Sequence, residues 1–401
     1  MKKRIIIYPN RIKGFAILII FAVINSSAFA QKASLIKSIK SDTILKKEAI
    51  INKKKKNTLI EFNGNDGPFI INDSLLYVVD EANHLKITTV FDKDSIPVEV
   101  SNLNKTEFFV SLASGYDIPD SEYELPEKIV AISDIEGNFN AFSSFLYSNK
   151  IIDKNYDWIF GEGHLVLNGD FVDRGKNVTQ VLWLIYKLDQ QAKAQNGQVH
   201  FILGNHEILN FYGDYRYNNG KYIKAAQVIS NKNNNEEALR FLYSENSEIG
   251  KWLATKNVIE KIGDYIFTHA GLSPDILKYD LNIKDINKLV RKNYNNLVKI
   301  EDKTERFLYS SDGPFWYRGL AREKLKSQEL DEILEEFKAK KIIIGHTPVD
   351  SISSKYEGKL INIDVHHGQQ MFSGKTYGLL IENCEEFIID DTNKIKALNK
   401  D

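Results

Sequence analysis

Four short polar segments in this chain each follow a run of apolar residues that is typical of a buried strand. The segments are Ser133–Asn138, Gly169–Gly175, Gly204–Glu207 and Gly345–Thr347, and the runs before them are Lys128–Ile132, Leu165–Leu167, Val199–Leu203 and Lys341–Ile344. Asp134 lies 36 positions before Asp170, which lies 35 positions before Asn205. This spacing leaves room for one helix between successive strands, so we expect the polar ends of the strands to meet at one edge of a sheet.

The polar residues at these strand ends are types that hold metal cations. Asp134 and Asp170 offer carboxylates, and Asn205 offers an amide oxygen. His269 and His346 each follow a further apolar strand. Such a set can hold two divalent cations roughly 3.5–4 Å apart, with Asp170 as the bridging ligand. Because two such cations polarise a phosphate ester and acidify a bridging water, the pattern predicts a two-metal phosphoesterase.

Three residues close to these ligands have side chains suited to phosphoryl transfer. His206, next to Asn205, can protonate the leaving alkoxide, and general acid catalysis of this kind is typically worth about 10²–10⁴-fold. Asp173 can orient His206 and keep it basic enough to hold that proton. Arg174 can bind two phosphate oxygens at once. Each motif alone is weak, but the order and spacing of all of them favour a catalytic site over a set of core residues.

The motifs together resemble those of the calcineurin-like metallophosphoesterase superfamily. Gly-Asp-x-x-Asp-Arg-Gly at 169–175 and Gly-Asn-His-Glu at 204–207 resemble its phosphoprotein phosphatase branch. Three further segments are most similar to the bacterial Shewanella-like phosphatases, namely His269–Gly271, Gly313–Gly319 and Gly345–Pro348. The resemblance covers about residues 128–382 and leaves the first 125 residues without a counterpart.

The resemblance implies a fold and a set of roles. The fold is α/β, a four-layer αββα sandwich, preceded here by a small β-rich accessory segment. The implied ligands of the first cation are Asp134, Glu136 and Asp170, and those of the second are Asp170, Asn205, His269 and His346. The implied general acid is His206, paired with Asp173, and the implied phosphate clamp is Arg174 with Arg318. Two divalent ions per chain are expected, with Mn²⁺ favoured and Fe, Mg²⁺ or Zn²⁺ as alternatives.

One position departs from the family pattern, which is Asp-x-His-Gly. This chain has Asp134-Ile135-Glu136-Gly137, so a carboxylate takes the place of a histidine ligand. A first site with three carboxylates is harder and favours Mn²⁺, Fe or Mg²⁺ over Zn²⁺. The alternative is that Glu136 disables the first site and leaves a non-catalytic binding scaffold.

The N-terminal residues have the pattern of an export signal. Residues 1–30 combine five basic residues, an apolar run at Phe15–Ile24 and the small residues Ala28-Phe29-Ala30, so we expect cleavage before Gln31 and a periplasmic or secreted protein. The run is short for a membrane span, so no stable span is expected after cleavage. Losing the signal changes the formal net charge from −1 to −6, and residues 57–401 alone carry −13. An acidic body of this kind argues against nucleic acid as a partner.

The remaining chain divides by composition. We predict a disordered lysine-rich leader at 31–57, a β-rich accessory segment at 58–125, the catalytic domain at 126–390 and a C-terminal tail at 391–401. The accessory segment is expected to form a small antiparallel layer packed beside the catalytic domain, with strands at Thr58–Phe62, Leu75–Val79, Leu85–Val90 and Glu107–Val110 and a turn at Asn63–Gly67. Helices are predicted at Asn177–Ala194, Glu236–Thr255, Ile283–Leu297 and Leu325–Lys338. The single cysteine, Cys384, falls in a strand-like run at Gly378–Ile389 and can form no disulfide within the chain.

These features favour an exported, metal-dependent phosphatase that acts on phosphate monoesters by in-line attack of a metal-bridging hydroxide. The substrate class favoured is phosphorylated protein. The alternatives are a broad phosphatase for small phosphate esters, a dinucleoside polyphosphate hydrolase and the scaffold described above. Tyr212, Tyr215, Arg216 and Tyr217 are placed to shape a substrate pocket, and one of His366 and His367 could line the cleft. His164 and His200 are expected to have core or surface roles, and the oligomeric state is left open.

Overall fold

A computed structural model describes residues 65–398 of this protein, apart from 81, 83, 90, 103 and 297–299. The predicted signal segment, lysine-rich leader and strand at Thr58–Phe62 therefore lie outside the described residues. The described residues belong to one unit of the chain, Ile60–Asp401. Within them, no helix is both long enough and apolar enough to cross a membrane.

Two six-stranded mixed sheets form the centre of this unit. Sheet I contains, in spatial order, β17 (Ile395–Ala397), β16 (Glu385–Asp390), β15 (Tyr377–Glu382), β7 (Lys128–Ile132), β8 (His164–Asn168) and β9 (Gln198–Ile202). Sheet II contains β13 (Ser353–Lys355), β14 (Leu360–Asn362), β12 (Lys341–Ile344), β11 (Tyr265–Thr268), β10 (Ile259–Ile262) and β6 (Glu122–Tyr123). The four strands predicted before the polar segments are β7, β8, β9 and β12.

The sheets pack against each other because their strands are apolar on both faces. In β7, Ile129 and Ala131 join a buried cluster with Phe267 and Ile343 of sheet II. Val130, on the opposite face of β7, belongs to the larger buried cluster that includes the helices. Successive side chains of a strand point to opposite faces, so a strand buried on both faces reads as an unbroken apolar run.

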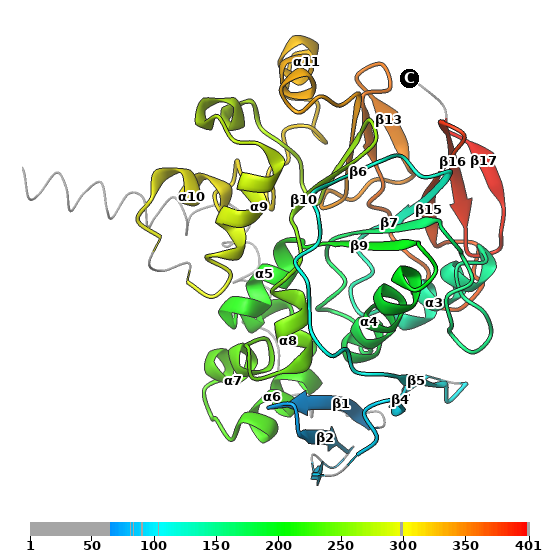
Figure 1. Ribbon diagram of the computed structural model, residues 1–401, viewed down its shortest axis with the longest axis vertical. Helices are drawn as coiled ribbons and strands as arrows, with labels where there is room; N and C mark the ends of the chain where they lie inside the picture. The colour runs from blue at the N-terminus through cyan, green and yellow to red at the C-terminus, as the bar shows by residue number, and fades with distance from the viewer. Residues whose placement is uncertain are drawn as a thin grey trace, which may run out of the picture. The chain divides into compact units, whose positions relative to one another are not determined.

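Helices cover the outer faces and complete the four layers, as Figure 1 shows. α3 (Phe139–Ser148) and α4 (Val178–Lys193) connect β7 to β8 and β8 to β9, which pair in parallel as the motif spacing predicted. α9 (Ile283–Arg291) packs against β10, and α11 (Ser327–Glu336) contributes Leu330, Ile333 and Leu334 to the large cluster. The prediction of a four-layer α/β fold is confirmed.

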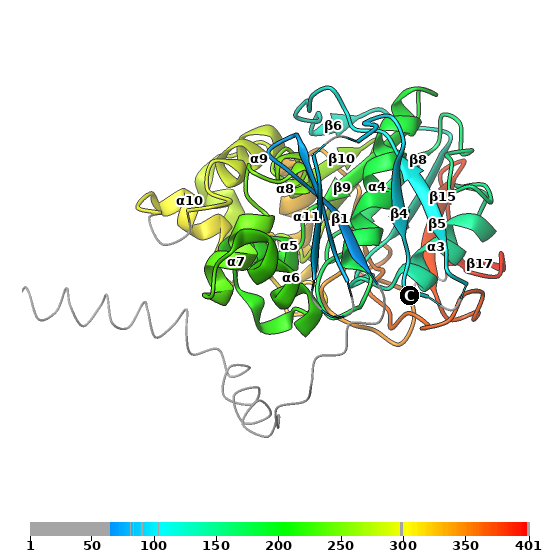
Figure 2. The same cartoon turned by 90° about the horizontal axis from the view of Figure 1, so that it is seen from below.

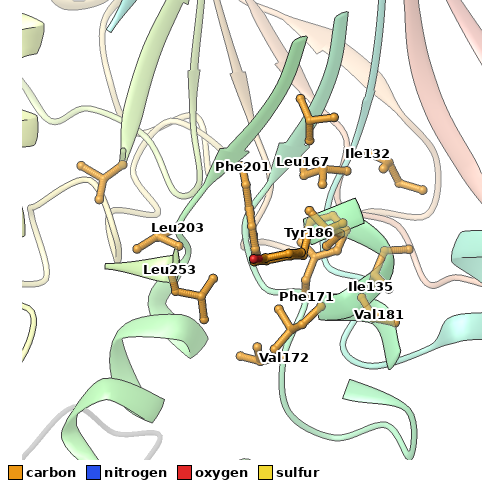
Figure 3. Packing of buried hydrophobic residues seen from close by; sticks show 14 of the residues in the cluster. Ile132, Ile135, Leu167, Phe171, Val172, Val181, Tyr186, Phe201, Leu203 and Leu253 are labelled. Atoms are coloured by element: carbon orange, nitrogen blue, oxygen red, sulfur yellow. The ribbon is translucent and has the colours of Figure 1, made fainter. Parts of the chain in front are cut away.

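The apolar residues inside the motifs anchor the polar loops in the core. Ile135, Phe171 and Val172 alternate with the acidic motif residues and are at most 1% exposed. Figure 3 shows them packed among side chains from the strands and from α4. The ring centroid of Phe171 lies 5.4 Å from that of Phe201 on β9. Because these side chains are fixed in a close-packed core, the carboxylates between them have defined positions.

The accessory segment forms a small antiparallel layer on the helices that cover sheet I. It consists of β1 (Asp66–Ile71), β2 (Leu75–Val79) and β3 (Leu85–Thr88) in one sheet, and β4 (Ile96–Glu99) and β5 (Glu107–Val110) in another. β1, β4 and β5 contact α4, as Figure 2 shows from below. The strands β1 and β4 were missed, and the predicted turn at Asn63–Gly67 is wrong where Asp66 and Gly67 open β1.

The other helices lie mainly between β9 and β12. They are α5 (Asn205–Tyr212), η1 (Tyr215–Tyr217), α6 (Gly220–Ser230), α7 (Asn235–Leu242), α8 (Glu248–Leu253), η2 (Pro274–Tyr279) and α10 (Lys303–Leu308). The single helix predicted for Glu236–Thr255 is interrupted, because the Ser247 hydroxyl accepts from the Gly250 N–H at 2.9 Å and starts α8.

The strand predicted through Cys384 is also interrupted. β15 and β16 form a hairpin, and Asn383 and Cys384 connect them with φ values of 53° and 62°. Two left-handed residues are the geometry of a tight type I′ turn, so Cys384 is exposed at a turn and not paired in a strand.

Candidate active site

The predicted ligands meet where the strands of both sheets end. Asp134, Asp170 and Asn205 follow β7, β8 and β9 of sheet I, whereas His269 and His346 follow β11 and β12 of sheet II. The expectation that they share the edge of one sheet was therefore too simple. We call this region the catalytic end of the strands.

The loops at the catalytic end have left-handed backbone at the ligand positions. The φ angles of Asp134, Asp170 and His346 are 54°, 59° and 65°. Residues other than glycine seldom adopt such angles, and when they do so they cluster at functional sites. The loops also bond one another, since the Asp134 N–H donates to the Gly169 carbonyl at 3.0 Å and the Gly345 N–H to the His269 carbonyl at 2.7 Å.

Two glycines make room for the carboxylates. A Cβ on Gly204 would lie 2.2 Å from Oδ1 of Asp170, and a Cβ on Gly345 would lie 2.5 Å from Oδ2 of Asp134. Both distances are far shorter than atomic contact allows, so any side chain at either position would displace a ligand.

The second half of the site combines two histidines with a carboxylate and an amide. Nε2 of His269 lies 3.1 Å from Oδ2 of Asp170 and 3.1 Å from Oδ1 of Asn205. Ligand atoms of Asp170, His269 and His346 all lie within 4.8 Å of one another. Nδ1 of His269 is 2.9 Å from the Asn168 carbonyl, which orients the ring as in metal sites. Nε2 of His346 is buried and has no hydrogen-bond partner among the described residues, so this half of the site fits a cation.

Charge in this half is balanced by a proton on His269, whereas His346 is neutral. Burial raises the pKa of Asp170, but His269 and His206 outweigh burial and hold that pKa below its ordinary range. Burial lowers the pKa of His269, yet the Asp170 carboxylate raises it to about 9. Burial and the neighbouring His269 hold the pKa of His346 well below its ordinary value. A cation among these residues would replace the proton on His269 and bond neutral imidazoles.

The first half of the site is built from carboxylates. Asp134 and Glu136 lie beside a further buried carboxylate, Asp364, in the same cavity. Burial and the charge of Asp364 raise the pKa of Asp134 well above its ordinary value. Glu136 forms an ion pair with Arg174. Sequence reasoning missed Asp364, although its place two residues past β14 was a signal that could have found it.

His206 is placed as a proton donor facing the ligands. Its Nδ1 is 2.7 Å from Oδ2 of Asp173, and its Nε2 is 3.8 Å from Oδ2 of Asp170. Asn210 donates to Oδ1 of Asp173 at 2.9 Å and holds that carboxylate in place. Burial lowers the pKa of His206, but Asp170 and Asp173 raise it to about 9, so the imidazole keeps its proton at neutral pH.

Glu207 is a positioning residue to which no role was assigned from the sequence. Its carboxylate accepts from the N–H groups of Gly204, Asp170 and Phe171 at 2.8, 3.0 and 2.8 Å. It thereby joins the loop after β8 to the start of α5. These bonds set the distance between Asp170 and the neighbouring Asn205.

The two predicted clamp arginines reach the same cavity from different loops. The backbone N–H of Arg174 donates to the Tyr217 carbonyl at 3.0 Å, and the Arg174 guanidinium forms an ion pair with Glu136. The Arg318 guanidinium donates to the His346 carbonyl and to the Thr347 hydroxyl, the latter at 3.0 Å. Each arginine has further N–H groups with which it can bind a ligand.

The cavity has a volume of about 1700 Å³ and is lined partly by the accessory segment. Glu99, Asn102 and Lys105 line it beside the motif residues. His366 and His367 also line it, and Nε2 of His367 is 2.8 Å from the Ser133 carbonyl.

The residues predicted to shape a substrate pocket, at the end of α5 and in η1, differ in whether they contact His206. The Tyr217 ring lies 4.9 Å from the His206 ring, centroid to centroid. Tyr212 instead donates its hydroxyl to the Asn293 carbonyl at 3.2 Å, and Arg216 bonds Asp214. Of these residues, the structure brings Tyr217 into contact with the predicted acid.

Comparison with known proteins agrees with this geometry. The model of the calcineurin-like phosphoesterase family matches residues 127–350. Over 279 residues the chain is 33% identical to Shewanella-like protein phosphatase 1 of Plasmodium berghei. The alignment covers 68% of this chain and 74% of the relative. Over 294 residues it is 26% identical to Shewanella-like protein phosphatase 2 of Arabidopsis thaliana, with 63% and 74% covered.

A solved structure is similar over most of the chain. It is a cold-active protein-tyrosine phosphatase of a psychrophilic Shewanella species, with a TM-score of 0.74 and 33% identity, covering 84% of this chain and 99% of that one. The predicted resemblance and enzyme class are confirmed. The chain belongs to the calcineurin-like phosphoesterase family and is a phosphatase of that family.

Proposed function

We propose that this protein removes phosphate from phosphorylated proteins with the help of two divalent cations, with Mn²⁺ favoured. The observation that carries the proposal is the meeting of Asp170, Asn205, His269 and His346 beside a protonated, Asp173-bound His206. When bound, the cations would polarise the phosphate ester and acidify a water. The chain's own residues would supply the ligands, a proton and the contacts that orient the phosphate.

His206 would give its Nε2 proton to the oxygen of the leaving group. Asp173, bonded to Nδ1, keeps the imidazole oriented and stabilises the protonated form until transfer. Arg174 and Arg318 would hold two oxygens of the phosphate from opposite loops. Since Arg174 is paired with Glu136, phosphate binding requires that it use its other N–H groups or exchange this partner.

The volume of the cavity and the names of the relatives support a protein substrate. The cavity exceeds the roughly 300–1,000 Å³ that is usual for sites of small ligands. Two similar proteins are named protein phosphatases, and the similar solved structure is named a protein-tyrosine phosphatase. A phosphorylated side chain on an extended segment would fill the site better than a small ester.

Hydrolysis of p-nitrophenyl phosphate by the full chain, with Mn²⁺ and with chelator, tests the activity. Asp170→Asn removes the bridging carboxylate, and Asp350→Asn, an exposed carboxylate beyond His346, is the matched control. We expect Mn²⁺-dependent turnover that is abolished in Asp170→Asn and unchanged in Asp350→Asn. No turnover with Mn²⁺, Fe, Mg²⁺ or Zn²⁺ from the folded chain would refute the phosphatase mechanism and favour the scaffold alternative.

Competition between substrates tests the substrate class. Phosphotyrosyl and phosphoseryl peptides would be compared with free phosphotyrosine, phosphoserine and a dinucleoside polyphosphate by kcat/KM. We expect the peptides to exceed their free amino acids, because the flanking residues contact the cavity wall. Equal values for peptide and free amino acid would contradict a protein substrate and favour the small-ester alternative.

We also propose that the protein acts after export. The support is the basic start, apolar run and small residues within 1–30, all outside the described residues. Cell fractionation with N-terminal sequencing tests this. A chain beginning at Gln31 outside the cytoplasm is expected, and a cytoplasmic chain that retains Met1–Ala30 would contradict export.

A further inference from the structure

Among the carboxylates that line the cavity, Asp364 is a buried one that no sequence motif marked. Asp364 is 3% exposed, and its Oδ2 has no hydrogen-bond partner among the described residues. An ionised carboxylate that is buried without a partner is costly, so such groups are normally paired or bound to a metal. The unpaired oxygen lies on a residue that lines the same cavity as Asp134, Glu136 and Asp170.

The backbone places Asp364 as firmly as the predicted ligands. β14 pairs with β12 in parallel so that Asn362 lies opposite Ile344, and Asp364 and His346 each lie two residues further on. The Asp364 N–H donates to Oδ1 of Asn362 at 3.0 Å. Its carbonyl accepts from the Val349 N–H at 2.8 Å. The carboxylate is therefore fixed at the end of a strand, like the ligands from the other strands.

The negative charges around Asp364 favour a bound cation. The carboxylates of Asp134, Glu136 and Asp170 line the same cavity and add like charge around it. The two arginines that line the cavity have other partners, Arg174 with Glu136 and Arg318 with the His346 carbonyl and Thr347. Neither arginine donates to Asp364 within the described part of the chain.

We propose that Asp364 is a direct ligand of the first cation, completing an oxygen-only set with Asp134 and Asp170. The inference rests on the proposed function, since it names a ligand of that same site. It explains how the chain tolerates Glu136 in place of the histidine of the family pattern. Even while Glu136 pairs with Arg174, three carboxylates remain for the first cation. Oxygen-only coordination favours Mn²⁺ or Mg²⁺ over Zn²⁺.

Mn²⁺ binding to the chelator-treated full chain tests the proposal without reference to turnover. Calorimetric titration and elemental analysis would compare the native chain with Asp364→Asn and with the exposed control Asp350→Asn. We expect two ions per chain for the native protein and the control. In Asp364→Asn one ion should keep its affinity, while the other should be weakened by more than the roughly 10–100-fold that is typical when a partner outside the ligand shell is lost. The electron paramagnetic resonance signal of a coupled Mn²⁺ pair should then become that of a single ion.

A variant that exchanges the ligand type sharpens the test. Asp364→His adds an imidazole where the proposal has an oxygen ligand, so the ratio of Zn²⁺ to Mn²⁺ affinity at the weaker site should rise by about tenfold or more. An unchanged ratio would overturn direct ligation.

Folding of the variants is checked by thermal unfolding in chelator. Asp364→Asn should unfold at a temperature no lower than the native chain, because the substitution removes an unpaired buried charge. A clearly lower midpoint would show that Asp364 is required for folding and would overturn the proposal. Two ions of native affinity in Asp364→Asn would also overturn it, while metal-dependent turnover of the native chain would leave the proposed function intact. Loss of that turnover in the native chain would instead refute the proposed function.

Discussion

Two clusters of histidines and carboxylates in the described part of the chain differ in how completely their polar atoms are paired. Away from the catalytic end, His164, His200 and Glu260 form a continuous network. His200 reaches Oε2 of Glu260 at 2.5 Å through Nδ1 and Nδ1 of His164 at 2.9 Å through Nε2. Oε1 of Glu260 accepts from the Asn257 side chain at 2.8 Å. Both ring nitrogens of His200 are therefore used within the chain.

At the catalytic end the pairing is incomplete and the backbone is strained. Nε2 of His346 and Oδ2 of Asp364 are buried and have no hydrogen-bond partner in the part of the chain that the structure describes. Asp134, Asp170 and His346 have left-handed backbone, whereas His200 and Glu260 lie in regular strands. Burial alone does not distinguish the two clusters. The distinguishing feature is an unpaired atom on a rigid element, which marks a place for a ligand from outside the chain.

The largest expected effect is on catalysis, from His206→Ala. Turnover of alkyl phosphates should fall about 10²–10⁴-fold, since their leaving groups need a proton. Aryl phosphates should lose less, and Mn²⁺ content should not change. The steady-state rates of both substrate types, beside His200→Ala as a histidine of the paired network, would measure this. Equal losses for alkyl and aryl substrates would remove His206 as the acid.

The next largest effect should come from cation removal, which should change the thermal stability through residues of the catalytic end and not through the His200 network. Free Mn²⁺ at a thousandfold its Kd stabilises the native state by about 4 kcal/mol, so chelator should lower the thermal midpoint of the native chain. His346→Ala should lose most of this shift, because it removes a ligand. Glu260→Leu should retain it, although its midpoint is lower throughout. If chelator lowered the thermal midpoint of His346→Ala by as much as that of the native chain, His346 would not be a ligand of the cation.

Replacement of a carboxylate by leucine should act in opposite directions at the two places. Glu260→Leu leaves Nδ1 of the buried His200 without its acceptor and removes one of the acceptors of the Asn257 side chain, so it should lower the free energy of unfolding by about 1–3 kcal/mol. Asp364→Leu removes a carboxylate that has no hydrogen-bond partner among the described residues, so the chain in chelator should be as stable as native or more so. Urea unfolding of both variants measures this, and a similar loss in both would contradict the comparison.

The smallest expected effect is on the pH dependence of stability. Burial and the charge of His200 lower the pKa of His164 to about 4, where Tyr123 also packs on the pair. Between about pH 4 and pH 6.5 the unfolded chain therefore binds more protons at this residue than the folded chain. The stability is present above pH 6.5 and is lost as the pH falls toward 4.

His164→Gln should consequently lose less stability than the native chain between about pH 7 and pH 5 in urea unfolding. His84→Gln, which changes an exposed histidine, should follow the native chain. Parallel curves for all three proteins would show that His164 does not contribute.

Much of the fold and of the site could be predicted because the signals are local. The helix predicted at Asn177–Ala194 begins and ends at the caps of α4, since an amphipathic pattern reports its own bounds. The spacing of Asp134, Asp170 and Asn205 predicted three adjacent parallel strands, because one helix must fit between each pair. The identity of most predicted ligands depended likewise on short motifs at strand ends.

Other features could not be predicted because they depend on distant partners. The motifs predicted that the loops of Glu136 and Arg174 meet, but not that these two side chains form an ion pair, because that depends on the side-chain positions in the folded loops. The accessory segment reads only as strands, and its position beside the cavity depends on how β1, β4 and β5 pack on α4.

Asp364 shows the limit most clearly. Its place just past a strand is a weak signal that many polar residues share, and its significance comes from burial, from three neighbouring carboxylates and from an oxygen that has no partner among the described residues. Residue type and spacing decided which chemistry is available at the catalytic end. The packing of two sheets decided which charges share a cavity, because electrostatic cost depends on distance and burial, and the order of residues along a chain specifies neither.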